Sequence, residues 1–439
     1  MLHSDISTAD ALAHLHTAEP NDAASLDRRR FLRLLGLGLG AGMAGSMLGS
    51  PLLDQLMPGH DPAAWAAGPI GAHDGILVLI GMYGGNDGLN SVVPITDSAY
   101  YHQRGSLAIA NTAALPIDAT TGLHPNLTEF KRQWNLGQLA IVEGIGYANP
   151  DLSHFNSIAY WMSGRPNTAS STGWIGRWLD GHLAGARDLF AAAHIGDSVP
   201  LTMVGAVSRG TSVPASAPTF GADATPADLH RSRAIRAMKT TNQGTWHNLV
   251  SSALVDALDV GKTLAPVIPA TGMAAGPLSS QLEVAARMIN ANLGFRVLST
   301  SLNDFDHHAD HRTEHAARMT ELNDGVRRFF EVLNPAWAHR VTVATFSEFG
   351  RTSWANESLG TDHGTAAPQF VIGPNVQGGR YGQRPTIAGL ARWERMAHHV
   401  DYRSYYASLL DGWMGGGSTD VLGGSFANLG LFRSGPGQI

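Results

Sequence analysis

The sequence predicts an α/β protein in which helices cover both faces of a mostly parallel central sheet, a doubly wound arrangement. Two observations predict this class. Apolar runs of strand length, at residues 75–82, 139–147, 294–301 and 341–346, alternate with stretches of helical length and periodicity. Residues that suit ligand binding follow these runs, as expected where parallel strands end at one edge of a sheet.

Composition limits the function. The 439 residues are 44% hydrophobic, which is enough for a large core, and the formal charge of -6 with 15% charged residues gives no basic field. We therefore expect no nucleic-acid partner. Cysteine is absent, which excludes disulfides, thiolate metal sites, a cysteine nucleophile and a sulfatase aldehyde made from cysteine.

The N-terminal stretch, residues 1–66, is typical of an extension followed by a twin-arginine signal peptide. Arg28, Arg29 and Arg30 precede a glycine-rich apolar run at 34–53, and Ala64-Trp65-Ala66 offers a cleavage site. We expect the twin-arginine translocase as a partner, a periplasmic or secreted product, and no stable membrane insertion after cleavage. An uncleaved membrane anchor is the alternative.

Residues 67–439 are expected to form the catalytic domain. Its first strand, 75–82, runs into Gly84-Gly85-Asn86-Asp87-Gly88, where glycines permit a tight turn that brings Asp87 to the rim of the sheet; a plain Asn-Asp-Gly turn is the alternative. A helix at 126–135 and a strand at 139–147 follow. Ser153 then precedes a helix at 155–162, either as its N-cap or as a nucleophile at the positive helix end.

The remaining elements continue the alternation. We expect helices at 172–180 and 226–239, with residues 190–280 as an insertion or cap, and then a helix at 278–292 and the strand at 294–301. A long helix from about 308 to 333 would place His308, His311 and His315 on one broad face. The strand at 341–346, a short strand at 370–372 and a helix at 402–413 complete the domain.

Four predicted strand ends carry groups that bind metals. Carboxylate and imidazole without thiolate suit zinc, manganese or iron better than a soft metal. The groups at the strand ends are Asp87, Asp306 with His308, Glu348, and Asp362 with His363. Further candidates are Asp304, His154, His307 and His311. The second rank also includes His315, His398 and His399.

The sequence defines the nucleophile less clearly than it defines the metal-binding groups. The chain contains no G-x-S-x-G elbow, which argues against an α/β-hydrolase. If Ser153 attacks a substrate, a metal must lower its pKa, and Arg165, Arg351 or a second metal must hold the developing anion. Glu348 and Arg351 either bind the metal or substrate directly or form a buried ion pair that holds the loop leading to the metal ligands.

Several motifs together resemble one family. Over residues 74–414 the chain is similar to the twin-arginine-exported domain of unknown function 1501, grouped with the alkaline phosphatase and sulfatase-like superfamily. The motifs that carry the resemblance are Gly84-Gly85-Asn86-Asp87-Gly88-Leu89-Asn90, Ser153-His154-Phe155, Phe305-Asp306-x-His308, Thr345-Phe346-Ser347-Glu348-Phe349-Gly350-Arg351 and Gly360-Thr361-Asp362-His363-Gly364.

The resemblance implies an alkaline-phosphatase-like core with two divalent ions, of zinc, manganese or calcium, with iron or copper as alternatives. It also implies roles for individual residues: Asp87 resembles the first-strand ligand, Asp362 and His363 resemble the Asp-His-Gly pair, and Ser153 takes the position of the nucleophile. Asp306 and His308 look like the ligands of the other ion. The chain reads Asn303-Asp304-Phe305-Asp306-His307-His308 where the family has Asp-Thr-His, so either Asp304 or Asp306 can be the ligand. No third histidine is evident after His363.

These observations lead to the expectation of an exported, metal-dependent hydrolase that acts on a small-molecule or polysaccharide ester of phosphate or sulfate. Ser153 or an activated water would attack, and Arg351 would hold charge. The alternatives are an exported metal- or glycan-binding protein without turnover and a His-rich iron or copper redox enzyme.

Overall fold

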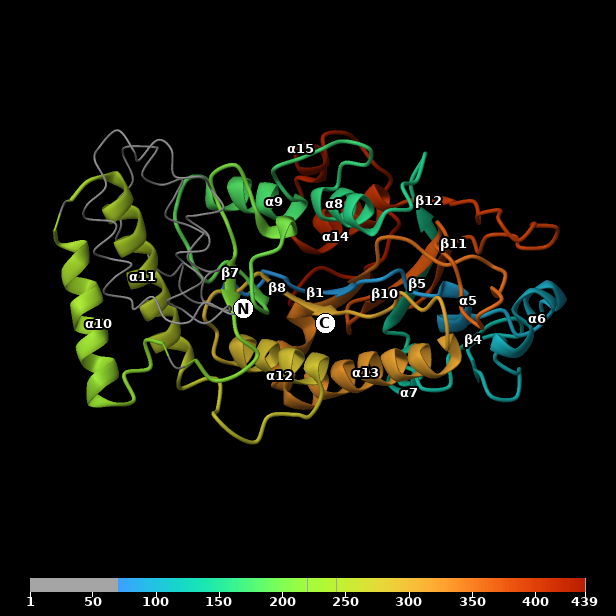
Figure 1. The fold of residues 1–439 in the computed structure, drawn as a ribbon, viewed down its shortest axis with the longest axis horizontal. Coiled ribbons are helices and arrows are strands. Elements are labelled where there is room, and N and C mark those ends of the chain that lie inside the picture. The colour runs from blue at the N-terminus through green and yellow to red at the C-terminus, as the bar shows by residue number, and fades with distance from the viewer. Residues whose placement is uncertain (1–69, 219, 242, 439) are drawn as a thin grey trace, which may run out of the picture.

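A computed structural model describes residues 70–218, 220–241 and 243–438. The predicted twin-arginine stretch and the Ala64-Trp65-Ala66 site lie outside these residues. Within them, a central sheet lies between two helical layers, which confirms the predicted fold class (Figure 1). No helix in the described part of the chain is long and apolar enough to cross a membrane.

The main sheet has nine strands in the order β11-β5-β10-β9-β1-β8-β6-β7, with β12 also paired to β5. All of its pairs are parallel except those of β10, which runs antiparallel to β5 and β9. The strands are β1 Ile76–Met82, β5 Leu139–Gly146, β6 Ala192–Ile195, β7 Thr211–Val213, β8 Val297–Leu302, β9 Val341–Phe346, β10 Ala367–Ile372, β11 Gly379–Gly382 and β12 Val400–Asp401.

The two helical layers follow from the alternation of side chains along the strands. In β1, Ile76, Val78 and Ile80 join the core beneath one layer, whereas Leu77 and Leu79 join the core beneath the other. The first layer contains α7 Thr128–Asn135, α12 Pro277–Asn290 and α13 His311–Val332. The second contains α8 His154–Ser163, α9 Trp174–Leu183, α14 Tyr402–Trp413 and α15 Ser418–Leu422. Every position of β1 is buried, which explains its unbroken apolar run.

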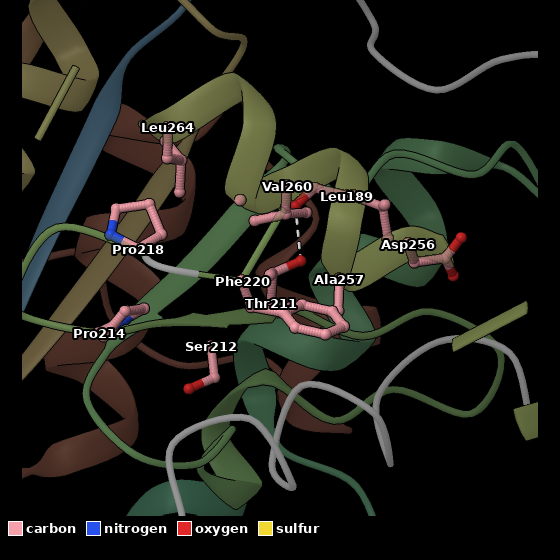
Figure 2. A pocket seen from close by; sticks show the side chains of 12 residues that line it. Leu189, Thr211, Ser212, Pro214, Pro218, Phe220, Asp256, Ala257, Val260 and Leu264 are labelled. Carbon is pink, nitrogen blue, oxygen red and sulfur yellow. Dashed lines mark hydrogen bonds between the residues drawn. The ribbon is translucent and has the colours of Figure 1, made fainter. Parts of the chain in front are cut away.

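The segment expected as an insertion divides into two parts. Strands β6 and β7 extend the main sheet, whereas α10 Pro226–Lys239 and α11 Thr245–Leu264 pack together beyond its β7 edge (Figure 1). A pocket of mainly apolar side chains lies between α11 and β7, where Thr211 donates a hydrogen bond to the carbonyl of Leu189 at 2.6 Å (Figure 2). Part of the segment that is predicted to be an insertion or cap therefore belongs to the main sheet, as strands β6 and β7.

Smaller elements occupy the opposite end of the sheet (Figure 1). They comprise α5 Gly88–Ser91, α6 Ser98–Arg104 and a three-stranded sheet of β2 Val92–Val93, β4 Gly122–Leu123 and β3 Leu115–Pro116. Short 3₁₀ segments lie at η2 Gly105–Leu107, η3 Leu201–Met203 and η4 Pro335–Arg340. Asp87 caps α5 and Asp97 caps α6, each by accepting a hydrogen bond from the second backbone N–H that follows it.

The start of α13 differs from the prediction. The helix begins at His311, and the preceding Asp310 has a left-handed conformation with φ 47°. That conformation interrupts the helical backbone. The prediction that His308 shares a helical face with His311 and His315 is therefore wrong, because His308 lies in the loop between β8 and α13 and is free to turn toward other strand ends.

Candidate functional site

Three histidines and an aspartate from three segments converge at one edge of the sheet. Nε2 of His363 lies 3.1 Å from Nε2 of His154 and 3.1 Å from Nε2 of His308. Oδ1 of Asp306 lies 3.2 Å from His363 Nε2 and 2.9 Å from His308 Nε2, and Oδ2 lies 3.3 Å from His154 Nε2. We call these four residues the ligand group.

Each residue of the ligand group lies in a segment that follows a strand of the main sheet. His154 is the first residue of α8, Asp306 and His308 lie in the loop after β8, and His363 lies between β9 and β10. The parallel strands β8, β1 and β9 are neighbours, so the loops that leave them meet. This placement matches the rule that sites in α/β sheets lie beyond the carboxyl ends of strands.

The second nitrogen of each imidazole is held by a group that only accepts hydrogen bonds. Nδ1 of His154 lies 2.8 Å from Oε1 of Glu348, and Nδ1 of His308 lies 3.1 Å from Oδ1 of Asp362. Nδ1 of His363 lies 2.8 Å from the carbonyl of Leu152. These partners assign the proton to Nδ1 in each ring, which leaves a lone pair on each Nε2.

Lone pairs and a carboxylate that face one another repel unless a cation lies between them. The donor set of the ligand group, three imidazole nitrogens and one carboxylate, suits zinc, manganese, iron or copper, whereas calcium takes oxygen ligands. Among the described residues, the ligand atoms of His154, Asp306 and His363 all lie within 4.8 Å of one another, a set that does not include His308. His308 contacts Asp306 and His363 of this set. The side chains present therefore fit a transition-type divalent ion.

Neighbouring residues keep the carboxyl group of Asp306 ionised. Burial alone would raise the pKa of its carboxyl, but the hydrogen bond and positive charge of Arg351 lower that pKa to about 2, together with His154 and His308. The hydrogen bond with Glu348 raises the pKa of His154, and burial lowers the pKa of His363. The ligand group thus holds an ionised carboxylate across the physiological range of pH.

Glu348 holds His154 of the ligand group in place without belonging to the group. Its side chain is buried, and Oε1 accepts a hydrogen bond from the backbone N–H of Gly84 at 2.8 Å as well as facing His154. Ser157 of α8 donates to the Glu348 carbonyl at 2.8 Å, which ties the helix to the same loop. A carboxylate that holds the remote nitrogen of a ligating histidine fixes its ring and tautomer. Neither role predicted for Glu348 is observed, because its carboxylate orients His154 and no ion pair with Arg351 is found among the described residues.

Arg351 is also buried, and its guanidinium faces the protein. It donates to Oδ1 of Asp306 at 2.7 Å and to the carbonyls of Gly85 at 2.8 Å and Phe305 at 3.1 Å. The carbonyls of Gly84 and Thr361 complete its partners. The expectation that Arg351 holds a substrate anion is therefore not met, because its donors are used to join three loops and position Asp306.

Gly84 is required where these loops meet. Its φ of +111° is unfavourable for other residues, and a Cβ atom there would lie 2.6 Å from the backbone nitrogen of Asp306. The tight turn predicted after the first strand is present, and it serves to let the Asp306 loop approach β1.

Asp87 lies in a separate buried cluster. Its carboxylate pairs with the Arg104 guanidinium, with Oδ1 2.7 Å from NH2, and it also caps α5. His311 Nε2 lies 2.8 Å from Asp87 Oδ2 in the same cluster. Although burial opposes ionisation, Arg104 and His311 hold the Asp87 pKa well below its usual value. The structure thus does not bring Asp87, His307 or His311 into the ligand group.

The choice between two aspartates is resolved by the backbone. Asp304 has a left-handed φ of +66° and its side chain is 84% exposed, 3.8 Å from Arg318. Asp306, two residues later, enters the ligand group instead. Asp362 is 52% exposed; its Oδ1 faces His308 and accepts from Nδ2 of Asn356 at 3.3 Å, so it orients a ligand in this arrangement.

Ser153 lies between two residues that contact the ligand group, since the Leu152 carbonyl faces His363 and His154 belongs to the group. It occupies the N-cap position of α8, yet its side chain does not cap the helix. Its backbone N–H donates to Oδ1 of Asp151 at 2.8 Å, and its hydroxyl has no hydrogen-bond partner among the described residues. The hydroxyl is therefore available at the positive end of the helix.

His154 is the member of the ligand group that sequence reasoning ranked too low. It supplies the third histidine that was sought after His363, but from a position 209 residues before it. The available signal was its place directly after Ser153, between the predicted strand at 139–147 and the predicted helix at 155–162.

Comparisons with known proteins give a family and a set of distant structures. Among curated proteins none matches the sequence. The solved structures that are similar to the chain include Ps i-CgsB, with 13% identity, coverage of 81% of this chain and 75% of that chain, and a TM-score of 0.37. They also include a protein in the alkaline phosphatase superfamily from Vibrio parahaemolyticus, with 10% identity, coverage of 82% and 72%, and a TM-score of 0.34.

A third solved structure is alkaline phosphatase from the Antarctic bacterium TAB5, with 10% identity, coverage of 71% of this chain and 92% of that chain, and a TM-score of 0.33. The match in sequence is to a family model described as a protein of unknown function, DUF1501, over residues 140–401. This range contains every residue of the ligand group, together with Ser153, Glu348, Arg351 and Asp362. It spans more than half of the chain, and the protein accordingly belongs to the DUF1501 family.

Proposed function

We propose that the protein is a metal-dependent hydrolase of phosphate or sulfate esters. The observation that supports this most directly is the ligand group, in which three Nε2 lone pairs and the Asp306 carboxylate face one another. Ser153, whose side chain does not cap α8, directly precedes His154 in the sequence. A divalent ion bound there would supply Lewis-acid activation of an ester oxygen.

The residues around the ligand group have roles that follow from their contacts. Glu348, Leu152 and Asp362 fix the three imidazole rings, and Arg351 fixes Asp306. Ser153 is the proposed nucleophile, and the backbone N–H groups at the start of α8 favour negative charge beside it.

The test combines metal analysis with turnover. Protein folded in its native host is expected to contain bound zinc, manganese or another divalent transition ion, and to hydrolyse an aryl phosphate, phosphodiester or sulfate. Ser153→Ala should lower kcat by at least about a hundredfold without loss of the metal, whereas Ser198→Ala, at an exposed position, should leave kcat unchanged. Metal-loaded protein that cleaves none of these esters would contradict the proposal.

A second candidate is supported by the composition of the ligand group. Three imidazoles and one carboxylate also suit a single redox-active iron, manganese or copper ion. Asp87, the first ligand expected for a second ion, is paired with Arg104. Iron or copper in the native protein, together with a redox signal and no ester hydrolysis, would favour this reading over the hydrolase.

Location is proposed from the sequence alone. The arginines at 28–30 and the apolar run after them support export by the twin-arginine translocase to the periplasm or the medium. Replacing Arg28 and Arg29 by lysine should retain the protein in the cytoplasm, as measured by cell fractionation. Unchanged export of this variant would exclude that route.

A further inference from the structure

Carboxylates flank the residues of the ligand group along the chain. Four further carboxylates lie within four residues of a ligand, whereas Arg312 is the single arginine or lysine in the same segments, 150–158, 302–312 and 359–367. The four carboxylates are Asp151, Asp304, Asp310 and Asp362. The side chains of Asp304 and Asp362 are 84% and 52% exposed, so their charges face the solvent through which a substrate must arrive.

The two arginines that contact the ligand group or Asp304 are already engaged by other groups. Arg351 touches the ligand group, but it is buried and its donors face Asp306 and backbone carbonyls. Arg318 lies 3.8 Å from Asp304 and 3.3 Å from Glu321, so its charge is shared with two carboxylates. The charge of a substrate must therefore be borne mainly by the bound ion and the start of α8.

Apolar side chains are exposed beside the same group. Phe155 directly follows the ligand His154 and is 89% exposed, and Leu359 lies four residues before His363 and is 54% exposed. Leu359 also has a left-handed φ of +56°, and its carbonyl accepts a hydrogen bond from the backbone N–H of His311 at 3.1 Å. Exposed apolar side chains next to a binding group suit a ligand with an apolar part.

On the basis of these charges and apolar side chains we infer the substrate class. The substrate is an ester whose tetrahedral centre carries one negative charge and bears an apolar substituent, as in a phosphodiester or a sulfate monoester, in preference to the dianion of a phosphate monoester. This inference rests on the proposed function, because it assigns a substrate to the same ligand group.

A matched pair of ligands without an ester bond tests the charge. Phenylphosphonate is a dianion at mildly alkaline pH, and methyl(phenyl)phosphinate is a monoanion with the same phenyl ring. Calorimetric titration of metal-loaded protein should give tighter binding of the phosphinate, by about tenfold at low salt. Benzenesulfonate, which is also a monoanion, should bind within about threefold of the phosphinate, and a much larger difference between the two monoanions contradicts a preference set by charge.

Two variants separate the contributions of charge and apolar contact. Asp304→Asn should strengthen binding of the phenylphosphonate dianion about two- to threefold at low salt and change the monoanion less. Phe155→Ala should weaken binding of all the phenyl ligands about five- to tenfold. The control Trp246→Ala, which removes a 51% exposed aromatic residue at the start of α11, should leave every affinity unchanged.

The outcomes distinguish this inference from the proposed function. Equal or tighter binding of the phenylphosphonate dianion, or no effect of Phe155→Ala, overturns the inference. If monoanions bind better but no ester is cleaved, the recognition holds and the hydrolase proposal fails. If 4-nitrophenyl phosphate is cleaved faster than both bis(4-nitrophenyl) phosphate and 4-nitrophenyl sulfate, the hydrolase proposal holds and the inference fails.

Discussion

Nδ1 of His154 and Oε1 of Glu348 lie 2.8 Å apart, although 194 positions separate the two residues in the sequence. Glu348 also accepts a hydrogen bond from the backbone N–H of Gly84, just after β1. One buried carboxylate therefore fixes the ring of His154 relative to the sheet. The orientation of Nε2 toward Asp306 and His363 is thus determined by a residue that does not itself enter the ligand group.

Replacing this carboxylate should weaken metal binding. Glu348→Gln keeps the size of the side chain and an oxygen for Gly84, but it removes the charge that holds His154. We expect a 10- to 100-fold loss of metal affinity, as found for such supporting carboxylates, measured by competition with a chelator of known affinity. Glu331→Gln, on the exposed end of α13, is the control and should bind the metal as the parent protein does.

Removing a ligand should abolish stabilisation by the metal. A bound ion raises the free energy of unfolding by about 2.7 kcal/mol when its free concentration is a hundred times Kd. The melting temperature of the parent protein should therefore fall after chelation and recover on addition of metal. His363→Ala should show neither change, whereas His399→Ala, at an exposed position outside the group, should respond like the parent. Full metal content in His363→Ala would contradict the assignment of the ligand group.

Arg351→Lys tests the positioning role of this arginine. A lysine keeps one charge but cannot reach the four carbonyls and Asp306 together, which leaves buried acceptors without donors. We expect a loss of about 3 kcal/mol in the free energy of unfolding, measured in urea. An unchanged stability with a selective loss of substrate binding would instead restore the role of Arg351 as an anion-binding residue.

Acid should weaken the fold through a buried histidine distant from the ligand group. His194 in β6 lies 2.8 Å from the Ser299 hydroxyl, and burial lowers its pKa to about 4 from a usual value of 6.5. Between these values the unfolded chain binds a proton that the folded chain does not, so stability falls as pH decreases. From pH 7 to pH 5 this histidine alone should cost about 2 kcal/mol. The urea midpoints of His194→Gln should fall less over that interval than those of the parent.

The strands of the main sheet were predictable to different degrees. β9 was predicted at its observed bounds, because its six residues are buried on both faces and form a continuous apolar run. The short strands β6 and β7 carry His194 and Thr211, and the pairing of β6 with β8 and of β7 with β6 depends on contacts that are distant in sequence. The 20-residue helix α11 was missed although its apolar residues recur at helical spacing, because the composition around it suggested loops.

The candidate site was predictable in part. The residue types of the ligand group were recognised at strand ends, but the distinction between binding a metal and orienting a ligand depends on side-chain contacts. Asp87, Asp306 and Asp362 look alike in sequence, and only Asp306 is turned toward three imidazoles, whereas Asp87 meets Arg104. Glu348 and Arg351 were left open for the same reason, since their partners come from other strand ends.

The spread of the ligand group along the chain has a consequence for the order of assembly. His154 emerges from the ribosome more than two hundred residues before His363, and the Asp306 loop reaches its place only when Arg351 has joined it to the end of β1. A growing chain therefore cannot complete the proposed metal site until almost the whole domain has been synthesised and folded. We expect metal only in completely folded molecules and none in truncated or misfolded chains.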